Sequence, residues 1–362
     1  MKYSRLLVTG GAGFIGSNFI RYVLNNYPEV FVLNLDILTY AGSLNNLKDL
    51  PINSQYKFIE MDICEQDSVS EVINNNNIDA IVHFAAESHV DRSILGPSVF
   101  VRTNILGTFS LLESARNIWL LGKKLKIEKV RFHHISTDEV FGSLESGEPA
   151  FKEDTKYSPN SPYAASKASS DHLVRSYHHT YGMPFTLTNC SNNYGPYQFP
   201  EKLIPLMVLN AIEGKPLPIY GDGLQIRDWL FVEDHCEAIW QVLQEGKNGN
   251  SYNIGGNNQL SNNKIVDMVC KLIDEFKPNS PFSPHKDLKI FVSDRPGHDR
   301  RYAMDISKIK NDLGWTPKHD FYDGLKKTVE WYLKNEYWVS SIRNQQKYSD
   351  WVDQNYSQRG TL

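Results

Sequence analysis

The stretch that decides the fold is Gly10-Gly11-Ala12-Gly13-Phe14-Ile15-Gly16, near the start of a chain of 362 residues. A short apolar run, 5–9, precedes it, and residues 17–24 follow with apolar side chains at helical spacing. Strand, glycine turn and helix in this order are typical of a dinucleotide site, because side chains in the turn would keep the backbone away from a pyrophosphate. The pattern predicts cofactor contacts at Gly10, Gly13 and Gly16.

A second predicted strand, 30–35, ends at Asp36, which lies 20 residues after Gly16. A carboxylate in this place can bind the ribose hydroxyls of NAD and repels the additional phosphate of NADP. No Arg follows closely in the sequence. NAD is therefore the favoured cofactor.

Three more apolar runs, 56–61, 80–84 and 130–135, are separated by segments of helix length. This alternation predicts an α/β fold, a Rossmann-like doubly wound parallel sheet that is buried on both faces. Ligands of such sheets bind beyond the carboxyl ends of the strands. Those ends carry Asp36, Asp62, Ala85-Ala86 and Thr137, so we expect the site there.

The alternation weakens from about residue 189, where turn-rich segments take over. We expect residues 1–188 to form the NAD-binding domain, with residues 229–255 returning to it. Residues 189–228 and 256–362 are expected to form a smaller, mixed α/β lobe that binds the substrate.

The candidate catalytic residues are Thr137-Asp138-Glu139, after the fifth strand, and Tyr163 and Lys167 in a helix predicted to run to about residue 181. At a spacing of four residues, the Lys167 ammonium can lower the pKa of the Tyr163 phenol from about 10 toward neutrality and so make it a usable base. A simple dehydrogenation needs no additional carboxyls. Asp138 and Glu139 therefore indicate oxidation coupled to elimination, although the sequence leaves open which of them holds the proton.

The composition excludes several other classes of protein. The formal net charge of −4 does not indicate binding to nucleic acid or to an anionic membrane, which basic proteins favour. No early apolar run reaches the roughly 18 residues of a membrane-spanning helix, and we expect a cytoplasmic protein. The four cysteines lie far apart, without a Cys-x-x-Cys pair, so neither a disulfide framework nor a metal site is expected.

Longer motifs are more specific than the glycine turn. They are Leu-Thr-Tyr-Ala-Gly at 38–42, Ala-Ala-Glu-Ser-His-Val-Asp-Arg-Ser at 85–93, His-Ile-Ser-Thr-Asp-Glu-Val at 134–140 and Thr-Asn-Cys-Ser-Asn-Asn-Tyr-Gly-Pro at 188–196. With these motifs the chain resembles the extended short-chain dehydrogenase/reductases, specifically their dTDP-glucose 4,6-dehydratase family. The resemblance runs nearly end to end.

The resemblance implies a redox-neutral reaction on dTDP-glucose. Tyr163, assisted by Lys167, would take the proton of the 4-hydroxyl while hydride leaves carbon 4 for NAD, and Thr137 would bind that hydroxyl. Glu139 would then remove the proton of carbon 5 as Asp138 protonates the departing 6-hydroxyl. Hydride return to carbon 6 would give a 4-keto-6-deoxy sugar nucleotide.

The remaining site residues and the partner are also implied by the resemblance. The implied cofactor contacts are Phe14, Ile15, Asp36, Ile37, Leu38, Thr39, Asp62, Ile63, Phe84, Ala85, Ala86, Thr103, Tyr163, Lys167 and Asn193. The implied substrate contacts are Ser88, Thr137, Asn192, Lys202, Leu203, Pro218, Ile219, Tyr220, Arg227, Asn262, Arg295, His298 and Tyr356. A homodimer is expected through the helices near 104–121 and 163–181.

Other functions would use the same cofactor site. One alternative is another extended family member that acts on a nucleotide sugar, a 4-epimerase or a decarboxylase, which would share Tyr163 and Lys167. A second alternative from a closely related family is a GDP-mannose dehydratase. An epimerase has no use for Asp138 and Glu139. A catalytically silent NAD-binding relative is expected to lack reacting residues, whereas all of them are present in this chain.

Overall fold

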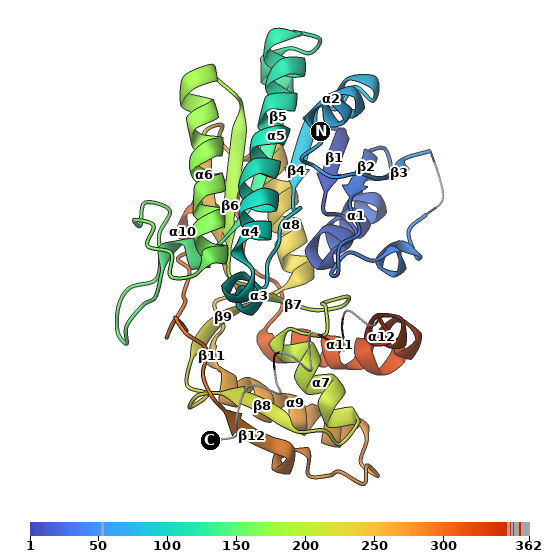
Figure 1. Ribbon diagram of the computed structural model, residues 1–362, viewed down its shortest axis with the longest axis vertical. Helices are drawn as coiled ribbons and strands as arrows, with labels where there is room; N and C mark the ends of the chain where they lie inside the picture. Colours follow the sequence, from blue (N-terminus) through green and yellow to red (C-terminus); the bar gives the residue numbers. More distant parts are fainter. Residues whose placement is uncertain (52–53, 346–347, 349, 351–354, 356–362) are drawn as a thin grey trace.

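The computed structural model describes residues 1–51, 54–345, 348, 350 and 355. They build a large sheet covered by helices, and a group of smaller sheets and helices below the carboxyl ends of its strands (Figure 1). The large sheet has seven strands in the order β10-β6-β5-β4-β1-β2-β3, and every neighbouring pair is parallel. Its strands are β1 (Arg5–Thr9), β2 (Phe31–Asp36), β3 (Tyr56–Glu60), β4 (Ala80–His83), β5 (Arg131–Thr137), β6 (Phe185–Cys190) and β10 (Asn250–Ile254).

The predicted doubly wound parallel sheet is confirmed, and the strand order changes direction between β1 and β4. Ligands of such sheets bind at this switch point. Two predicted strands end later than the apolar runs indicated: Asp36 is the last residue of β2, and Thr137 is the last residue of β5. The reason is pairing, because Thr137 still lies opposite Cys190 of β6.

Both faces of the sheet are buried. On β1, Leu6 and Val8 pack in one apolar core with Phe19 and Trp240, while Leu7 points to the opposite core. This explains why the strands are nearly continuous apolar runs. The helices of the first core are α1 (Phe14–Asn26) and α8 (Val232–Glu245), and those of the second are α2 (Gln66–Asn75), α5 (Gly107–Ala115) and α6 (Pro162–Tyr181).

A second lobe has an apolar core of its own. It holds a three-stranded sheet, β11 (Gln259–Ser261), β9 (Ile226–Phe231) and β7 (Asn192–Tyr194), and a parallel pair, β8 (Leu217–Tyr220) and β12 (Lys289–Val292). Its helices are α7 (Leu203–Ile212), α9 (Asn262–Phe276), α11 (Phe321–Lys334) and α12 (Glu336–Arg343). Within 229–255, the end of β9 lies in the three-stranded sheet, whereas α8 packs on the large sheet and β10 joins it.

Short elements connect these parts. They are α3 (Val90–Leu95), α4 (Pro97–Phe100), α10 (Ser307–Leu313), η1 (Leu44–Leu47), η2 (Val101–Leu106), η3 (Arg116–Leu121), η4 (Ile127–Lys129), η5 (Asp138–Phe141) and η6 (His285–Leu288).

The glycine turn is tighter than the sequence predicted. Helix α1 begins at Phe14 with Gly13 as its N-cap, so the expected start at residue 17 was wrong by about one turn. Gly10 has a φ of +72°, and a Cβ there would lie 2.5 Å from the Ala85 backbone N. A Cβ on Gly16 would lie 2.4 Å from the Gly10 carbonyl oxygen. Only glycine permits this packing, which leaves the first backbone N–H groups of α1 available to an anion.

Candidate active site

A cavity of about 450 Å³ lies at the carboxyl ends of the central strands. Every predicted catalytic residue lines it: Thr137, Asp138, Glu139, Tyr163 and Lys167. So does every predicted cofactor residue except Leu38, namely Gly10, Gly13, Phe14, Ile15, Gly16, Asp36, Ile37, Thr39, Asp62, Ile63, Phe84, Ala85, Ala86, Thr103 and Asn193. Leu38 lies outside the lining and contributes its backbone N–H to Asp36 instead. Their individual roles stay predictions.

Asp36 is held at the end of β2 by backbone donors. Its Oδ2 accepts from the N–H of Ala12 at 2.9 Å, and its Oδ1 accepts from the N–H of Leu38 at 2.8 Å. Burial raises the pKa of Asp36, and these two hydrogen bonds oppose the rise. Each oxygen keeps a lone pair for a hydroxyl donor, which fits a ribose.

The two candidate carboxyls lie where β5 ends and η5 begins. Thr137 caps η5, and its hydroxyl accepts from the N–H of Glu139 at 3.3 Å. The cap turns the chain sharply after the strand, so Asp138 and Glu139 are held at the cavity by backbone geometry and not by a mobile loop.

Asp138 and Glu139 have different environments. Asp138 is 2% exposed, and its Oδ2 has no hydrogen-bond partner within the described part of the chain. Burial, followed by the charge of Glu139, raises the pKa of Asp138 well above its usual range. Burial also raises the pKa of Glu139, but the charges of Arg295, Arg227 and Lys202 oppose it. The charges around the pair therefore favour the proton on Asp138 over Glu139.

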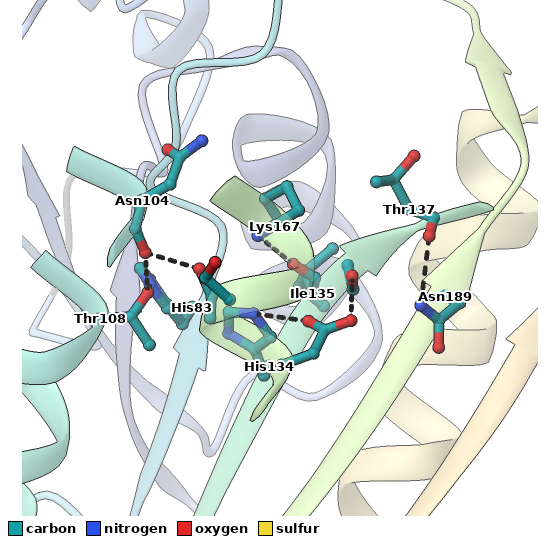
Figure 2. Close-up of polar contacts among 12 residues, drawn as sticks. His83, Asn104, Thr108, His134, Ile135, Thr137, Lys167 and Asn189 are labelled. Atoms are coloured by element: carbon teal, nitrogen blue, oxygen red, sulfur yellow. Dashed lines mark hydrogen bonds and ion pairs between the residues drawn. The ribbon is translucent and has the colours of Figure 1, made fainter. Parts of the chain in front are cut away.

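Tyr163 and Lys167 lie in the first turns of α6, where Ser161 caps the helix and Pro162 begins it. Lys167 is 4% exposed, and its Nζ donates to the Ile135 carbonyl oxygen of β5 at 2.8 Å (Figure 2). Burial and the charge of Glu139 raise the pKa of Tyr163 well above its usual value, while the Thr137 hydroxyl lowers it. The expected shift toward neutrality was therefore wrong in direction for the protein alone. The sequence showed the nearby ammonium but neither the burial nor the position of Glu139.

A second cavity, of about 170 Å³, adjoins the first, since Ser88, Glu139, Asn192, Glu201 and Lys202 line both. It is formed by the predicted substrate residues Ser88, Asn192, Lys202, Leu203, Pro218, Ile219, Tyr220, Arg227, Asn262, Arg295 and His298. The predicted contact Thr137 lies in the first cavity. Tyr356 lies outside the described residues.

Two arginines line the second cavity, of which Arg227 is buried and Arg295 is partly exposed. Arg227 donates from Nη2 to the Asp299 carbonyl oxygen at 2.9 Å, and its guanidinium lies 4.2 Å from the centre of the Tyr302 ring. The buried Nε of Arg295 has no hydrogen-bond partner among the residues described. An unused guanidinium donor suits a phosphate oxygen, because burial of an unpaired donor is costly.

Several residues at the cavities were missed by the sequence analysis. Asp91 lies with its Oδ1 3.6 Å from Arg295 Nη1 and accepts from the Tyr220 hydroxyl at 3.3 Å. Glu201 pairs with Arg92 at 3.0 Å. Asp91 lies within the motif 85–93, and Glu201 precedes Lys202, so position in the sequence was an available signal. An acid next to a base is nevertheless most often an ordinary surface pair.

Among the described residues, no group of three or more His, Cys, Asp or Glu side chains could hold a metal ion. None of the helices described is long and apolar enough to cross a membrane. The four cysteines are free thiols.

Comparison with known proteins identifies the family. The family model described as GDP-mannose 4,6 dehydratase matches residues 7–328. The dTDP-glucose 4,6-dehydratase of Shigella flexneri is 53% identical over 363 residues, which cover 98% of this chain and 99% of that protein.

Two solved structures agree in fold and sequence. The dTDP-glucose 4,6-dehydratase DesIV of Streptomyces venezuelae, solved with NAD bound, has a TM-score of 0.84 and 45% identity, covering 93% of this chain and 99% of that one. The dTDP-glucose 4,6-dehydratase of Bacillus anthracis in complex with NAD has a TM-score of 0.83 and 44% identity, and the match covers 94% of this chain and 99% of that one. The likeness indicated by the motifs is thus confirmed: the chain belongs to the dTDP-glucose 4,6-dehydratase family of extended short-chain dehydrogenase/reductases.

Proposed function

We propose that this protein is an NAD-dependent hydro-lyase that converts dTDP-glucose to dTDP-4-keto-6-deoxyglucose and water. The observation that carries the proposal is the pair Asp138 and Glu139: both line the first cavity, and Glu139 also lines the second. Burial raises the pKa of Asp138 well above its usual range, whereas at Glu139 the charges of Arg295, Arg227 and Lys202 oppose the rise, so we assign Asp138 as the acid and Glu139 as the base. Such a pair supplies an acid and a base at neutral pH.

NAD is the cofactor that the first cavity fits. The glycine turn brings backbone N–H groups to the position of a pyrophosphate, and Asp36 presents acceptors for ribose hydroxyls. When bound, NAD supplies a hydride acceptor for carbon 4 and a hydride donor for carbon 6.

Oxidation at carbon 4 requires a base for the hydroxyl proton. We assign that role to the Tyr163 phenolate, with the Thr137 hydroxyl orienting the substrate and the Lys167 ammonium, four residues further along α6, as the neighbouring cation. The proton moves to Tyr163 Oη as the C4–H bond breaks with its electron pair. The ketone formed at carbon 4 acidifies the proton on carbon 5.

Elimination then uses the carboxyls. Glu139 removes the carbon 5 proton, Asp138 gives its proton to the departing 6-hydroxyl, and the C5–C6 double bond forms as water leaves. Hydride addition at carbon 6 and return of the Glu139 proton to carbon 5 complete the product. Tyr163 has then gained the proton that Asp138 has lost, so one proton passing from Tyr163 to Asp138 resets the site.

The nucleotide is assigned to the second cavity, with the diphosphate at Arg227, Arg295 and Lys202. Support comes from the gathering of these three cations around one cavity on a chain with a net charge of −4, because such a cavity suits an anionic ligand. The proposed division of labour follows: residues 1–188 and 229–255 bind NAD, and residues 189–228 and 256–362 bind the nucleotide sugar.

A homodimer is proposed through the helices near 104–121 and 163–181. Exposed apolar side chains support it: Val101 and Leu106 of η2, Phe109 of α5 and Leu121 of η3 are 42–61% exposed. A cytoplasmic location is proposed as well, supported by four free cysteines, which fit a reducing compartment.

The test is incubation of purified protein with dTDP-glucose, without added NAD, in parallel with the Glu139→Gln variant. We expect the wild type to form a keto sugar that absorbs in alkali and has lost one water by mass. The variant should oxidise carbon 4 yet release little product. A 4-epimer with unchanged mass would make the protein an epimerase, and no reaction with any nucleotide hexose, even with NAD added, would make it a silent NAD-binding relative.

A further inference from the structure

A buried carboxylate lies behind the candidate catalytic lysine. Asp171 follows Lys167 by one turn of α6 and is wholly buried. Its Oδ2 accepts from the Ser136 hydroxyl at 2.8 Å and from the Tyr157 hydroxyl at 2.8 Å. Its Oδ1 lies 3.2 Å from Nε2 of His134, which is also wholly buried. Asp171 lines neither cavity, and the reaction proposed above does not use it.

Strand β5 connects this carboxylate to the site. The side chains of His134 and Ser136 contact Asp171. The carbonyl oxygen of Ile135, the residue between them, accepts from Lys167 (Figure 2). The next residue is Thr137. Successive residues of one strand therefore fix the position of α6 relative to the end of β5, and with it the position of Lys167 relative to Thr137.

Asp171 is the anion of this region. Burial raises its pKa, but contact with His134, the charge of Lys167 and the hydrogen bond from Ser136 bring it below the usual value. His134 is neutral at neutral pH, because burial lowers its pKa to about 4. Burial also lowers the pKa of His83 on β4 and raises that of the Cys190 thiol on β6, so both are uncharged.

The remaining charges around Lys167 do not replace Asp171. Arg175, further along α6, is a cation, and the Tyr157 phenol is neutral because burial raises its pKa. Tyr163, Asp138 and Glu139 lie on the cavity side. Burial lowers the pKa of Lys167, and the charge of Asp171 is the main influence that opposes this. A buried ammonium needs such a counter-charge to stay protonated.

We propose that Asp171 is a positioning residue, the buried counter-charge that keeps Lys167 protonated and, through β5, aligned behind Tyr163. This inference rests on the proposed function, because it assigns Asp171 a part in the same oxidation. Its effect on Tyr163 passes through Lys167 and β5, since Asp171 lies about two helical turns from Tyr163.

The decisive variant is Asp171→Asn, which has the same shape. Its amide oxygen can accept from Ser136 and Tyr157, and its NH2 can donate to His134 Nε2 after a change of tautomer, so chiefly the charge is lost. We expect the alkaline limb of the pH profile for carbon 4 oxidation to move about one pH unit toward neutrality, because Lys167 then deprotonates more easily. The rate on the plateau should change little.

Tyr157→Phe is the matched control. It removes a hydrogen bond from the same carboxylate oxygen but leaves the charge, so its alkaline limb should stay in place. An unchanged limb in Asp171→Asn, or an equal shift in Tyr157→Phe, would overturn the proposal.

A thermal unfolding cycle with Lys167→Met tests the pair without any turnover. We expect each single variant to lose about 4 °C or more in melting temperature, because each leaves one buried charge unbalanced, and the double variant to lose less than the sum. Additive losses would overturn the proposal. If Asp171→Asn alone does not fold, we expect the additional Lys167→Met change to restore folding, and a double variant that also does not fold would overturn the proposal. An inactive wild type would instead contradict the proposed function, and the cycle would still report on the pair.

Discussion

The two cavities of the site are built in different ways. The first follows the carboxyl ends of the parallel strands, where the backbone comes close together at Gly10 and Ala85. The second has charged side chains from segments that are distant in the sequence, such as Asp91, Arg227 and Arg295. Backbone geometry is thus expected to position NAD in the first cavity, and side-chain charge is expected to position the nucleotide in the second. Changes to each cavity should therefore act on different ligands.

The largest loss of activity is expected from a change to Tyr163, the proposed base for the 4-hydroxyl. Tyr163→Phe removes the base for the 4-hydroxyl but none of the cations assigned to the diphosphate, so oxidation should fall by about 1000-fold while dTDP still binds. Stopped-flow absorbance of the reduced cofactor and calorimetry with dTDP measure the two quantities. Tyr181→Phe, at the exposed end of the same helix, is the control. Near-normal turnover in Tyr163→Phe would remove Tyr163 as the base.

A smaller effect is expected from the arginine with a free donor. Arg295→Met should weaken dTDP binding by about 10- to 100-fold, because charge-assisted hydrogen bonds to phosphate are lost, while the amount of retained NAD stays the same. Calorimetry and absorbance of released cofactor provide the comparison. Arg300→Met is the control, since Arg300 is exposed and paired with Asp222. Loss of NAD in Arg295→Met would show that the two cavities are not separable.

The first cavity could be predicted from the sequence better than the second, because it depends on local backbone geometry. Gly10, Gly16 and Asp36 obey local rules, since a turn and a strand end can be recognised within one βαβ unit. The error at the start of α1 arose because Gly16 interrupts the apolar spacing although it lies inside the helix. The ends of strands are harder to predict from apolar runs. Strand β5 continues through the polar residues Ser136 and Thr137, because both still pair with β6.

Tertiary contacts explain what the sequence could not predict. Asp91 and Arg295 come together only when the second lobe folds against α3, and resemblance, not spacing, supplied Arg295. The protonation of Asp138 and the raised pKa of Tyr163 depend on burial and on neighbouring charges. Such quantities belong to the folded site and not to a motif.

A third variant tests the backbone cavity directly. Gly10→Ala should weaken NAD retention by about 10-fold or more and lower the melting temperature, because its Cβ would lie 2.5 Å from the Ala85 N. Gly147→Ala is a matched control: Gly147 also has a positive φ, +85°, but a Cβ there meets nothing within 4 Å. Binding of dTDP should be unchanged in both variants. If Gly147→Ala lost as much NAD as Gly10→Ala, strain and not close approach would explain the effect.

The smallest effect is a pH-dependent gain of stability in Asp138→Asn. The folded protein raises the pKa of Asp138 above its unfolded value, so the folded state holds a proton that the unfolded chain releases above about pH 4. Wild-type stability therefore declines as pH rises through that window, whereas an amide does not titrate. We expect the variant to melt about 2 °C higher than the wild type near pH 8 and equally near pH 4 or below. Glu139→Gln should gain less, because Arg295, Arg227 and Lys202 favour the ionised form of Glu139. A variant that is less stable than the wild type near pH 8 would mean that Asp138 is ionised, and the acid and base of the elimination would then have to be exchanged.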